Sequence, residues 1–116
     1  MQKENYSGLN MWGLDLSGRD FSGVNLSDTT LDGKRIKGIN LKGANLTRAN
    51  LRNADLSDSD IRGANFQGSN ASGVNFSGCN LFGVDFRGAN LSGADFRNTN
   101  TDQPDFRGAN LTGAKF

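Results

Sequence analysis

The densest cluster of charge in this 116-residue chain consists of four basic side chains: Lys34, Arg35, Lys37 and Lys42. Such a cluster can bind a phosphate group or an acidic protein surface. A carboxylate, Asp32, lies beside the cluster in the sequence, and mixed charges are common on exposed surfaces. We therefore favour a solvated face and keep weak binding of nucleic acid or an acidic partner as the alternative.

Catalytic chemistry has few candidate residues in this sequence. The chain contains no histidine, which is the usual general base and the commonest metal ligand. No set of nucleophile, base and orienting group can be drawn from the pattern. The aspartates recur regularly but lack the glycine–aspartate nonapeptide pattern of calcium-binding β-rolls. We expect a non-enzymatic protein with no cofactor and no metal site.

Composition and charge limit the partners of the protein. The chain has 13 basic and 12 acidic residues, and its net charge of +1 argues against a strong nucleic-acid-binding surface or a strongly acidic one. No apolar run reaches membrane-spanning length, and no signal-peptide core is present. The single cysteine, Cys79, is expected to be buried and unpaired. We expect a cytoplasmic protein without membrane contact, folded as one domain over residues 1–116.

The elements that must hold these side chains follow a period of five residues. From Tyr6 to Phe116, 21 of the 23 positions in this phase are large and apolar, and we call these positions centres. The residue two before the centre is small or apolar in 20 of 23 repeats, and the residue just before it is Asn or Asp in 20 of 23. Residues two apart point to the same side of an extended chain, so both apolar positions face one core.

The glycines mark the turns between these short extended segments. All 16 lie two residues after a centre, where a type II turn needs a positive φ. Six repeats carry another residue there: Asp28, Arg48, Asn53, Asp58, Asn98 and Gln103. Asn and Asp tolerate the left-handed region, whereas Arg48 and Gln103 do so less readily, so we predict another turn type at those two corners.

A chain that turns the same way every five residues closes a loop and then climbs, so that successive coils pair as parallel strands do. The pattern predicts an all-β solenoid. The runs GANLTRANLRNADLSDSDIRGANF (residues 43–66) and FRGANLSGADFRNTN (residues 86–100) resemble the pentapeptide-repeat family, whose motif is A(D/N)LXX. The resemblance covers residues 4–116 and implies a right-handed quadrilateral parallel β-helix, with four pentapeptides per coil and about five to six coils.

With four pentapeptides per coil, residues 20 apart stack in columns. Two centre columns change from aliphatic residues to Phe in the C-terminal half, which predicts two internal Phe stacks, and we expect neighbours to fill the space around Ala71. The column from Asn10 to Asn110 predicts a ladder of amides. Arg35 and Lys115 interrupt a column of aspartates and should relieve the repulsion within it.

The first coils contain charged residues at positions that should face the core. Arg19 and Lys34 occupy inward positions, so we expect their side chains to reach solvent through a local distortion. Residues 1–5 should form an N-terminal cap or edge, and residues 19–37 should form less regular coils.

A second group of charges recurs on one outer face. Arg87 and Arg107 each lie two residues after an aspartate, Asp85 and Asp105 respectively. The alternation favours a self-neutralising charge lattice over a ligand site.

Two aromatic side chains are predicted to face outward, Trp12 and Phe82. Trp12 lies in the first coil, where we favour a capping role over a partner contact. Phe82 shares a column with Lys42 and Arg62, and we regard these residues as the best candidates for contact with a partner.

The C-terminal coil carries a second candidate contact. Phe106, Leu111 and Phe116 are core positions with no cap after them in this sequence. We favour an end-to-end homodimer through this coil. A longer parent chain, or a cap formed by Lys115 and the terminal carboxylate, are the alternatives.

We expect the protein to be a binding scaffold for another protein of unknown identity. Some members of the family that it resembles mimic DNA and protect gyrase from quinolones, which makes topoisomerase binding an alternative. The net charge of +1 and the outward-facing basic residues after the centres argue against that alternative.

Overall fold

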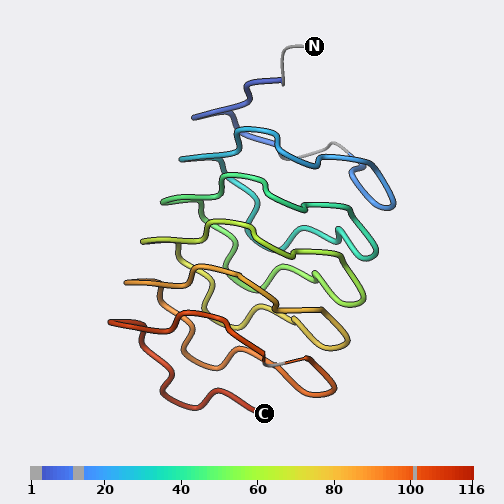
Figure 1. The fold of residues 1–116 in the computed structure, drawn as a ribbon. Coiled ribbons are helices and arrows are strands. Elements are labelled where there is room, and N and C mark those ends of the chain that lie inside the picture. The colour runs from blue at the N-terminus through green and yellow to red at the C-terminus, as the bar shows by residue number, and fades with distance from the viewer. Residues whose placement is uncertain (1–3, 12–14, 101) are drawn as a thin grey trace.

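Parallel β-bridges join residues 20 positions apart along the chain, from the Asn5–Asn25 bridge to the Asp95–Lys115 bridge. The computed structural model describes residues 4–11, 15–100 and 102–116. One coil therefore takes 20 residues, or four pentapeptides, in agreement with the family resemblance. The coils stack with the first and last described residues at opposite ends of a rod measuring 35 × 24 × 23 Å (Figure 1).

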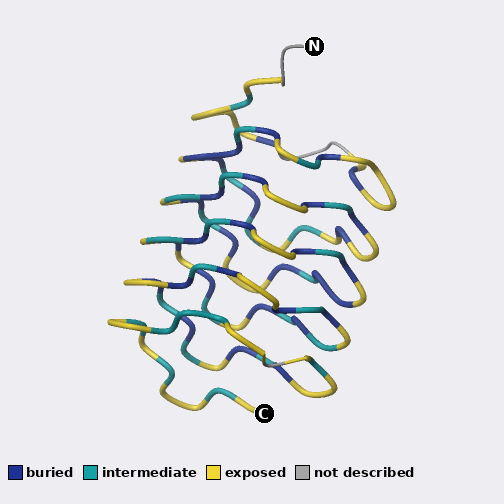
Figure 2. Cartoon of the chain, in the orientation of Figure 1, coloured by how far each residue is buried: buried dark blue, intermediate teal, exposed yellow. Residues whose placement is uncertain are grey.

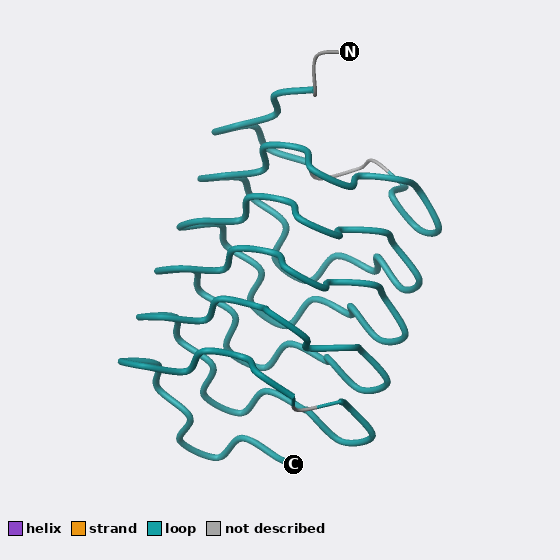
Figure 3. Cartoon of the chain, in the orientation of Figure 1, coloured by secondary structure: helices purple, strands orange, loops and turns teal. Residues whose placement is uncertain are grey.

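Within the described residues the structure has no helix and no continuous strand, only isolated bridges followed by turns (Figure 3). The bridging residue is the one before each centre. Around it the coils are joined by regular hydrogen bonds: the Leu46 N–H donates to the Asn65 carbonyl at 2.7 Å, and the Asn65 N–H donates to the Ala44 carbonyl at 2.9 Å. The predicted parallel pairing is present, but each extended segment is too short to count as a strand.

Most turns are closed by a hydrogen bond across the corner, but the turn at Gln103 is not, because Pro104 has no N–H. The Ala49 N–H donates to the Leu46 carbonyl at 3.1 Å, and φ is positive at all six non-glycine corners, including Arg48 at 58° and Gln103 at 63°. The prediction of another turn type is wrong for Arg48, whereas the corner at Gln103 shares the positive φ but lacks the closing hydrogen bond. At Arg48 the N–H also donates to the Gln67 carbonyl of the next coil at 3.0 Å, so pairing between coils imposes the left-handed conformation despite its cost.

The core is a column of centre and small side chains along the rod axis, with buried segments lining the coils between Met11 and Phe96 (Figure 2). The two predicted Phe stacks are confirmed. Phe66 and Phe86 stack at a centroid distance of 5.2 Å, and Phe76 and Phe96 stack at 5.0 Å. The two stacks also meet edge to face, which the column pattern did not predict. Ala71 is fully buried within this core.

Two inward-phase basic residues keep the hydrogen bonds that close their turns. Arg19 is exposed and Lys34 is half-buried. Their N–H groups close the usual turns, to the carbonyls of Leu16 at 3.2 Å and Leu31 at 3.1 Å. The expected local distortion is therefore absent from these turns, because a long side chain can bend outward from a regular backbone.

Candidate functional site

The Asn or Asp before each centre positions the side chain that follows the centre. Oδ1 of Asn80 accepts the N–H of Phe82 at 3.0 Å, and Oδ1 of Asn40 accepts the N–H of Lys42 at 3.0 Å. These contacts are Asx turns, in which a side chain caps its own backbone two residues later. Our sequence interpretation missed this role, although the constant spacing from Asn or Asp to the corner was a signal for it.

The predicted amide ladder is replaced by the same local bonds. Four amide oxygens in this column accept backbone N–H groups within their own pentapeptides: those of Asn50, Asn70, Asn90 and Asn110. The prediction of a ladder between coils is wrong for these oxygens, because each backbone donor lies within reach in the same turn.

Four Asp–Arg pairs, each two residues apart, form bidentate clips on the outer surface: Asp60–Arg62, Asp85–Arg87, Asp95–Arg97 and Asp105–Arg107. In each clip Arg Nη2 lies 2.6–2.7 Å from Asp Oδ2, and Arg Nε lies 2.9–3.0 Å from Asp Oδ1. The hydrogen bonds from Arg97 lower the pKa of Asp95 to about 2. The bidentate geometry places both charges of a pair in one rigid unit.

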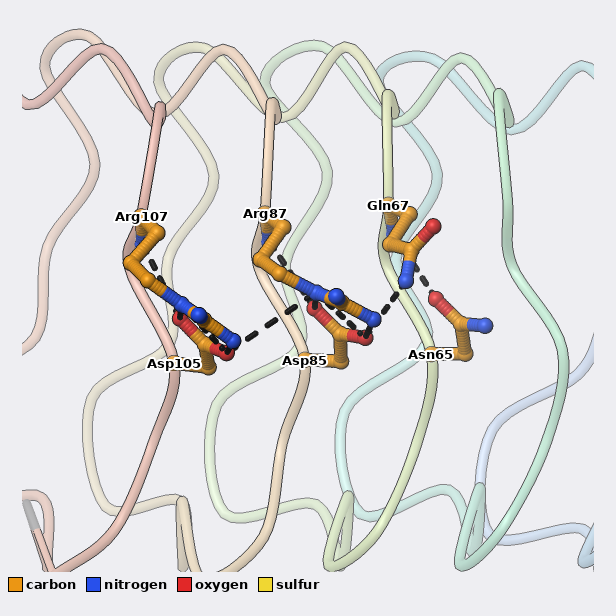
Figure 4. Close-up of polar contacts among 6 residues, drawn as sticks. All are labelled: Asn65, Gln67, Asp85, Arg87, Asp105 and Arg107. Atoms are coloured by element: carbon orange, nitrogen blue, oxygen red, sulfur yellow. Dashed lines mark hydrogen bonds and ion pairs between the residues drawn. The ribbon is translucent and has the colours of Figure 1, made fainter.

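Two of these clips join into a continuous ladder across neighbouring coils (Figure 4). Arg87 Nε lies 3.8 Å from Asp105 Oδ2, and Gln67 Nε2 donates to Asp85 Oδ2 at 2.6 Å. The side-chain hydrogen bond from Arg87 holds the pKa of Asp85 well below its usual range. Desolvation opposes this shift, and the hydrogen bond from Gln67 adds to it. The self-neutralising lattice predicted for this face is confirmed.

The basic cluster of residues 34–42 is partly neutralised by the next coil. Lys37 Nζ lies 3.6 Å from Asp58 Oδ2, and Arg35 bridges to Asp55 through the backbone. Desolvation opposes the shift, but hydrogen bonds from Ser57 and the charges of Lys37 and Arg35 lower the pKa of Asp55. The predicted relief of repulsion in this column is therefore present at Arg35.

Two other members of the cluster have no such partner. Among the described residues, no carboxylate lies within ion-pairing distance of Lys34 or Lys42. Arg62 does not extend the cluster as a free charge, because its guanidinium is held by Asp60 in its own pentapeptide.

We call the side of the rod around Phe82 the Phe82 face. It carries two neighbouring columns of outward side chains. One column consists of Asn40, Asp60, Asn80 and Asn100, and the other consists of Lys42, Arg62, Phe82 and Asp102. Phe82 is 50% exposed, as its phase predicted. Its carbonyl accepts the Gly63 N–H of the preceding coil at 2.9 Å, so an exposed ring stands on a fixed backbone. The structure thus brings the candidate residues Lys42, Arg62 and Phe82 together on one face.

The C-terminal coil exposes part of its apolar core. Phe116 is 63% exposed and stacks on Phe96 at a centroid distance of 5.2 Å, while Phe106 and Leu111 are half-buried. Trp12, the other candidate contact, lies outside the described residues.

Some features restrict the chemistry of the described residues further. Cys79 is buried, and desolvation raises the pKa of its thiol to about 12, so it is a poor nucleophile. No group of three potential metal ligands occurs in the described chain. No helix in the same part of the chain has the length and apolar character needed to span a bilayer.

Arg48 forms an ion pair with Asp28 of the preceding coil, a contact that the sequence interpretation missed. Arg48 Nε and Nη2 each lie 3.0 Å from a different carboxylate oxygen of Asp28. The two residues occupy successive corners of one column, so the 20-residue spacing was the signal. The hydrogen bonds from Arg48 lower the pKa of Asp28.

The stacked coils and the charged outer lattice define a solenoid repeat protein. The model of the pentapeptide repeat family, which represents eight copies of the repeat, matches this chain over three overlapping ranges: residues 39–78, 59–98 and 79–116. The chain belongs to the pentapeptide repeat family.

Solved structures of other pentapeptide repeat proteins resemble the chain. A protein from the thylakoid lumen of Arabidopsis thaliana is 34% identical, with 92% of this chain and 64% of that chain covered and a TM-score of 0.42. The protein alr5209 of Nostoc Pcc 7120 is 28% identical, with 94% and 85% covered and a TM-score of 0.55. The chain therefore spans less than two thirds of the length of the Arabidopsis protein.

A more distant similarity is to QnrB1, a plasmid-mediated fluoroquinolone resistance protein. The two chains are 18% identical, with 98% of this chain and 84% of that chain covered and a TM-score of 0.35. Comparison with curated protein sequences gave no match.

Proposed function

We propose that this protein is a non-catalytic scaffold that binds protein through the Phe82 face. The observation that carries the proposal is the 50% exposure of Phe82 in the body of the rod. The other exposed large hydrophobic residues of the described chain, Leu9 and Phe116, lie in its first and last coils. An aromatic side chain exposed away from the ends suits a binding anchor, because aromatic residues contribute most of the binding energy at many interfaces.

The backbone around Phe82 favours binding over incidental exposure. Its N–H is capped by Asn80 and its carbonyl is bonded to Gly63. The backbone beneath the ring is already ordered, so it loses little conformational freedom when a partner covers Phe82. Lys42 and Asp102, both exposed, supply a polar rim of mixed charge around the ring.

The proposal includes the winding of the scaffold. A right-handed quadrilateral β-helix of five to six coils is supported by the 20-residue pairing and by family membership. As a second contact we propose end-to-end association of two copies through the last coil, supported by the 63% exposure of Phe116 beside half-buried Phe106 and Leu111.

Two other functions have less support. A mimic of DNA needs free negative charge, but four aspartates of this surface are clipped to arginines in their own pentapeptides. The likeness to QnrB1 is too distant to support gyrase binding. Protection of gyrase supercoiling from a quinolone by the purified protein would overturn this ranking. Strongly salt-dependent binding to duplex DNA at low salt would instead favour the basic cluster of residues 34–42 as the functional surface.

Affinity capture with matched variants tests the proposed scaffold. Phe82→Ser removes the ring, and Arg52→Ser changes an exposed residue at the same position of another pentapeptide, also capped by an Asx turn. We expect the wild type and Arg52→Ser to retain the same bound protein and Phe82→Ser to lose it. Equal retention by both variants would refute the role of the Phe82 face.

A further inference from the structure

The outer column of the Phe82 face changes character over three successive coils. Arg62 is basic, Phe82 is apolar and Asp102 is acidic, and these residues are 20 apart in the sequence. Bridges from Asp60 to Asn80 and from Asn80 to Asn100 stack the three coils directly. The charged groups therefore lie on opposite sides of the ring, each about 4.8 Å away along the rod.

A two-fold axis perpendicular to the rod at Phe82 makes this column complementary to itself. The rotation carries the coil before Phe82 onto the coil after it. Arg62 then faces the partner's Asp102, Asp102 faces the partner's Arg62, and the two Phe82 rings meet on the axis. We propose that a second copy of this chain, running antiparallel, occupies the Phe82 face. The proposal rests on the proposed function, in which this face binds protein.

The neighbouring column is compatible with the same axis. The rotation places Asp60 opposite the partner's Asn100 and Asn80 opposite the partner's Asn80. An amide can donate to a carboxylate or pair with another amide, so no like charges face each other in this register. A parallel pair of rods would instead place Arg62 against Arg62 and Asp102 against Asp102. The charges thus select the antiparallel arrangement, as expected for an isologous interface.

The two charged groups retain the capacity for this contact. Arg62 uses Nε and Nη2 to clip Asp60, and its side chain remains 45% exposed, so further N–H groups can donate outward. Asp102 is exposed, and its backbone N–H is capped by Asn100 at 2.9 Å. Among the described residues no cation pairs with the Asp102 carboxylate.

The contact is small, because the axis at Phe82 lies one coil from the C-terminal end of this face. Only the coils of Arg62, Phe82 and Asp102 overlap with the partner, and three coils of about 4.8 Å across a side 23 Å wide give roughly 330 Å² per copy, well below a standard interface. Only one large apolar ring per copy lies on this face. We therefore expect a weak dimer with a dissociation constant on the order of 0.1–1 mM, so the concentration series that tests it must reach about 1 mM.

Sedimentation of the purified chain over a series of concentrations tests the proposal. We expect a monomer–dimer equilibrium, and we expect Arg62→Asp and Asp102→Arg each to weaken it at least about tenfold, because each variant places like charges opposite one another. An equimolar mixture of the two variants should restore the dimer, since both cross-contacts again join opposite charges. A chain that stays monomeric throughout, or a mixture that stays monomeric, would overturn the proposal.

Two controls separate this dimer from other outcomes. Phe116→Ser should remove only the end-to-end association proposed for the last coil and leave the dimer that depends on Arg62 and Asp102, whereas loss of all association in Phe116→Ser would overturn the dimer at Phe82. The proposed scaffold function is judged independently by affinity capture, since a chain that sediments as a monomer can still capture another protein through Phe82.

Disulfide cross-linking tests the position of the axis without relying on charge variants. Phe82→Cys places a thiol on the two-fold axis, and Arg52→Cys places one on an exposed site of another face. We expect mild oxidation to link Phe82→Cys into dimers faster than Arg52→Cys, while the native thiol of Cys79 stays buried. Equal rates for the two variants would refute the antiparallel contact at Phe82.

Discussion

The Asp58 carboxylate lies over the α-carbon of Gly78 one coil later, in the space that a β-carbon at Gly78 would occupy. Gly78 also has φ of +74°. Glycine is therefore required at this corner for two separate reasons, a left-handed backbone and a close approach. Gly38 has nearly the same φ, +72°, but nothing within 4 Å of the β-carbon position.

This pair of glycines separates strain from steric overlap. Gly38→Ala should lower the free energy of unfolding by about 1 kcal/mol through the left-handed backbone alone. Gly78→Ala should cost roughly 1 kcal/mol more, because Asp58 must turn away and release Lys37. Urea unfolding measures both. In a double-mutant cycle with Asp58→Ala the excess should disappear, and an unchanged excess would show that Asp58 is not its cause.

The Asp85–Arg87 clip should make stability depend on pH. The folded-state pKa of Asp85 lies below that of an unfolded aspartate, about 3.9, so the ionised pair stabilises the fold above about pH 4 and this contribution is lost as the pH falls below 4. Asp85→Asn keeps the Oδ1 acceptor but removes the charge. We expect it to cost up to about 1 kcal/mol at pH 7 and progressively less toward pH 2.

The control for this experiment is Asp32→Asn, which removes a carboxylate with no ion pair among the described residues. Its effect on the free energy of unfolding at pH 7 should be smaller than that of Asp85→Asn. Equal losses for the two variants, measured by urea unfolding across the pH range, would argue against a specific contribution from the clip.

Replacing Arg48 with glycine should stabilise the protein slightly. The left-handed φ of 58° costs an L-residue about 1 kcal/mol, whereas an exposed ion pair such as Arg48–Asp28 contributes little, because solvent screens it. Gln103→Gly relieves a similar φ of 63° without losing an ion pair, so its gain should be the larger one. Thermal unfolding of the two variants compares these gains, and a larger gain for Arg48→Gly would contradict this account.

Phe86 should be among the most costly residues of the core to truncate. Its ring contacts four others: Phe66, Phe76, Phe96 and Phe106. Phe86→Ala should lower the free energy of unfolding by about 3–5 kcal/mol, because it leaves a cavity between two stacks. Phe116→Ala, at a ring that is 63% exposed, should cost far less. Similar losses in chemical denaturation would contradict the described packing.

Cys79 should be unreactive until the protein unfolds. Burial raises the pKa of its thiol to about 12, and its Sγ donates to the Leu56 carbonyl at 3.1 Å. At pH 8 we expect almost no reaction with a water-soluble disulfide reagent in buffer and one thiol per chain in denaturant. Rapid labelling of the folded protein would show that this part of the core opens readily.

Much of the fold could be predicted because the pentapeptide period is a local property. Every repeat independently places apolar residues two apart, Asn or Asp between them, and Gly at the corner. Those features determine which side chains enter the core. They also correctly predict the Phe stacks, the buried state of Cys79 and the exposure of Phe82.

The pairing of individual polar side chains was decided only by the tertiary structure. The sequence placed Arg62 in one outer column with Lys42 and Phe82, but Asp60 in the same turn holds its guanidinium by two hydrogen bonds. The sequence also favoured another turn at Arg48, but pairing with the next coil imposes a positive φ there. A long side chain can reach several partners, and the backbone conformation of a corner residue is set by its hydrogen bonds to the neighbouring coils. Burial therefore follows from local periodicity, whereas these contacts depend on how neighbouring coils constrain one another.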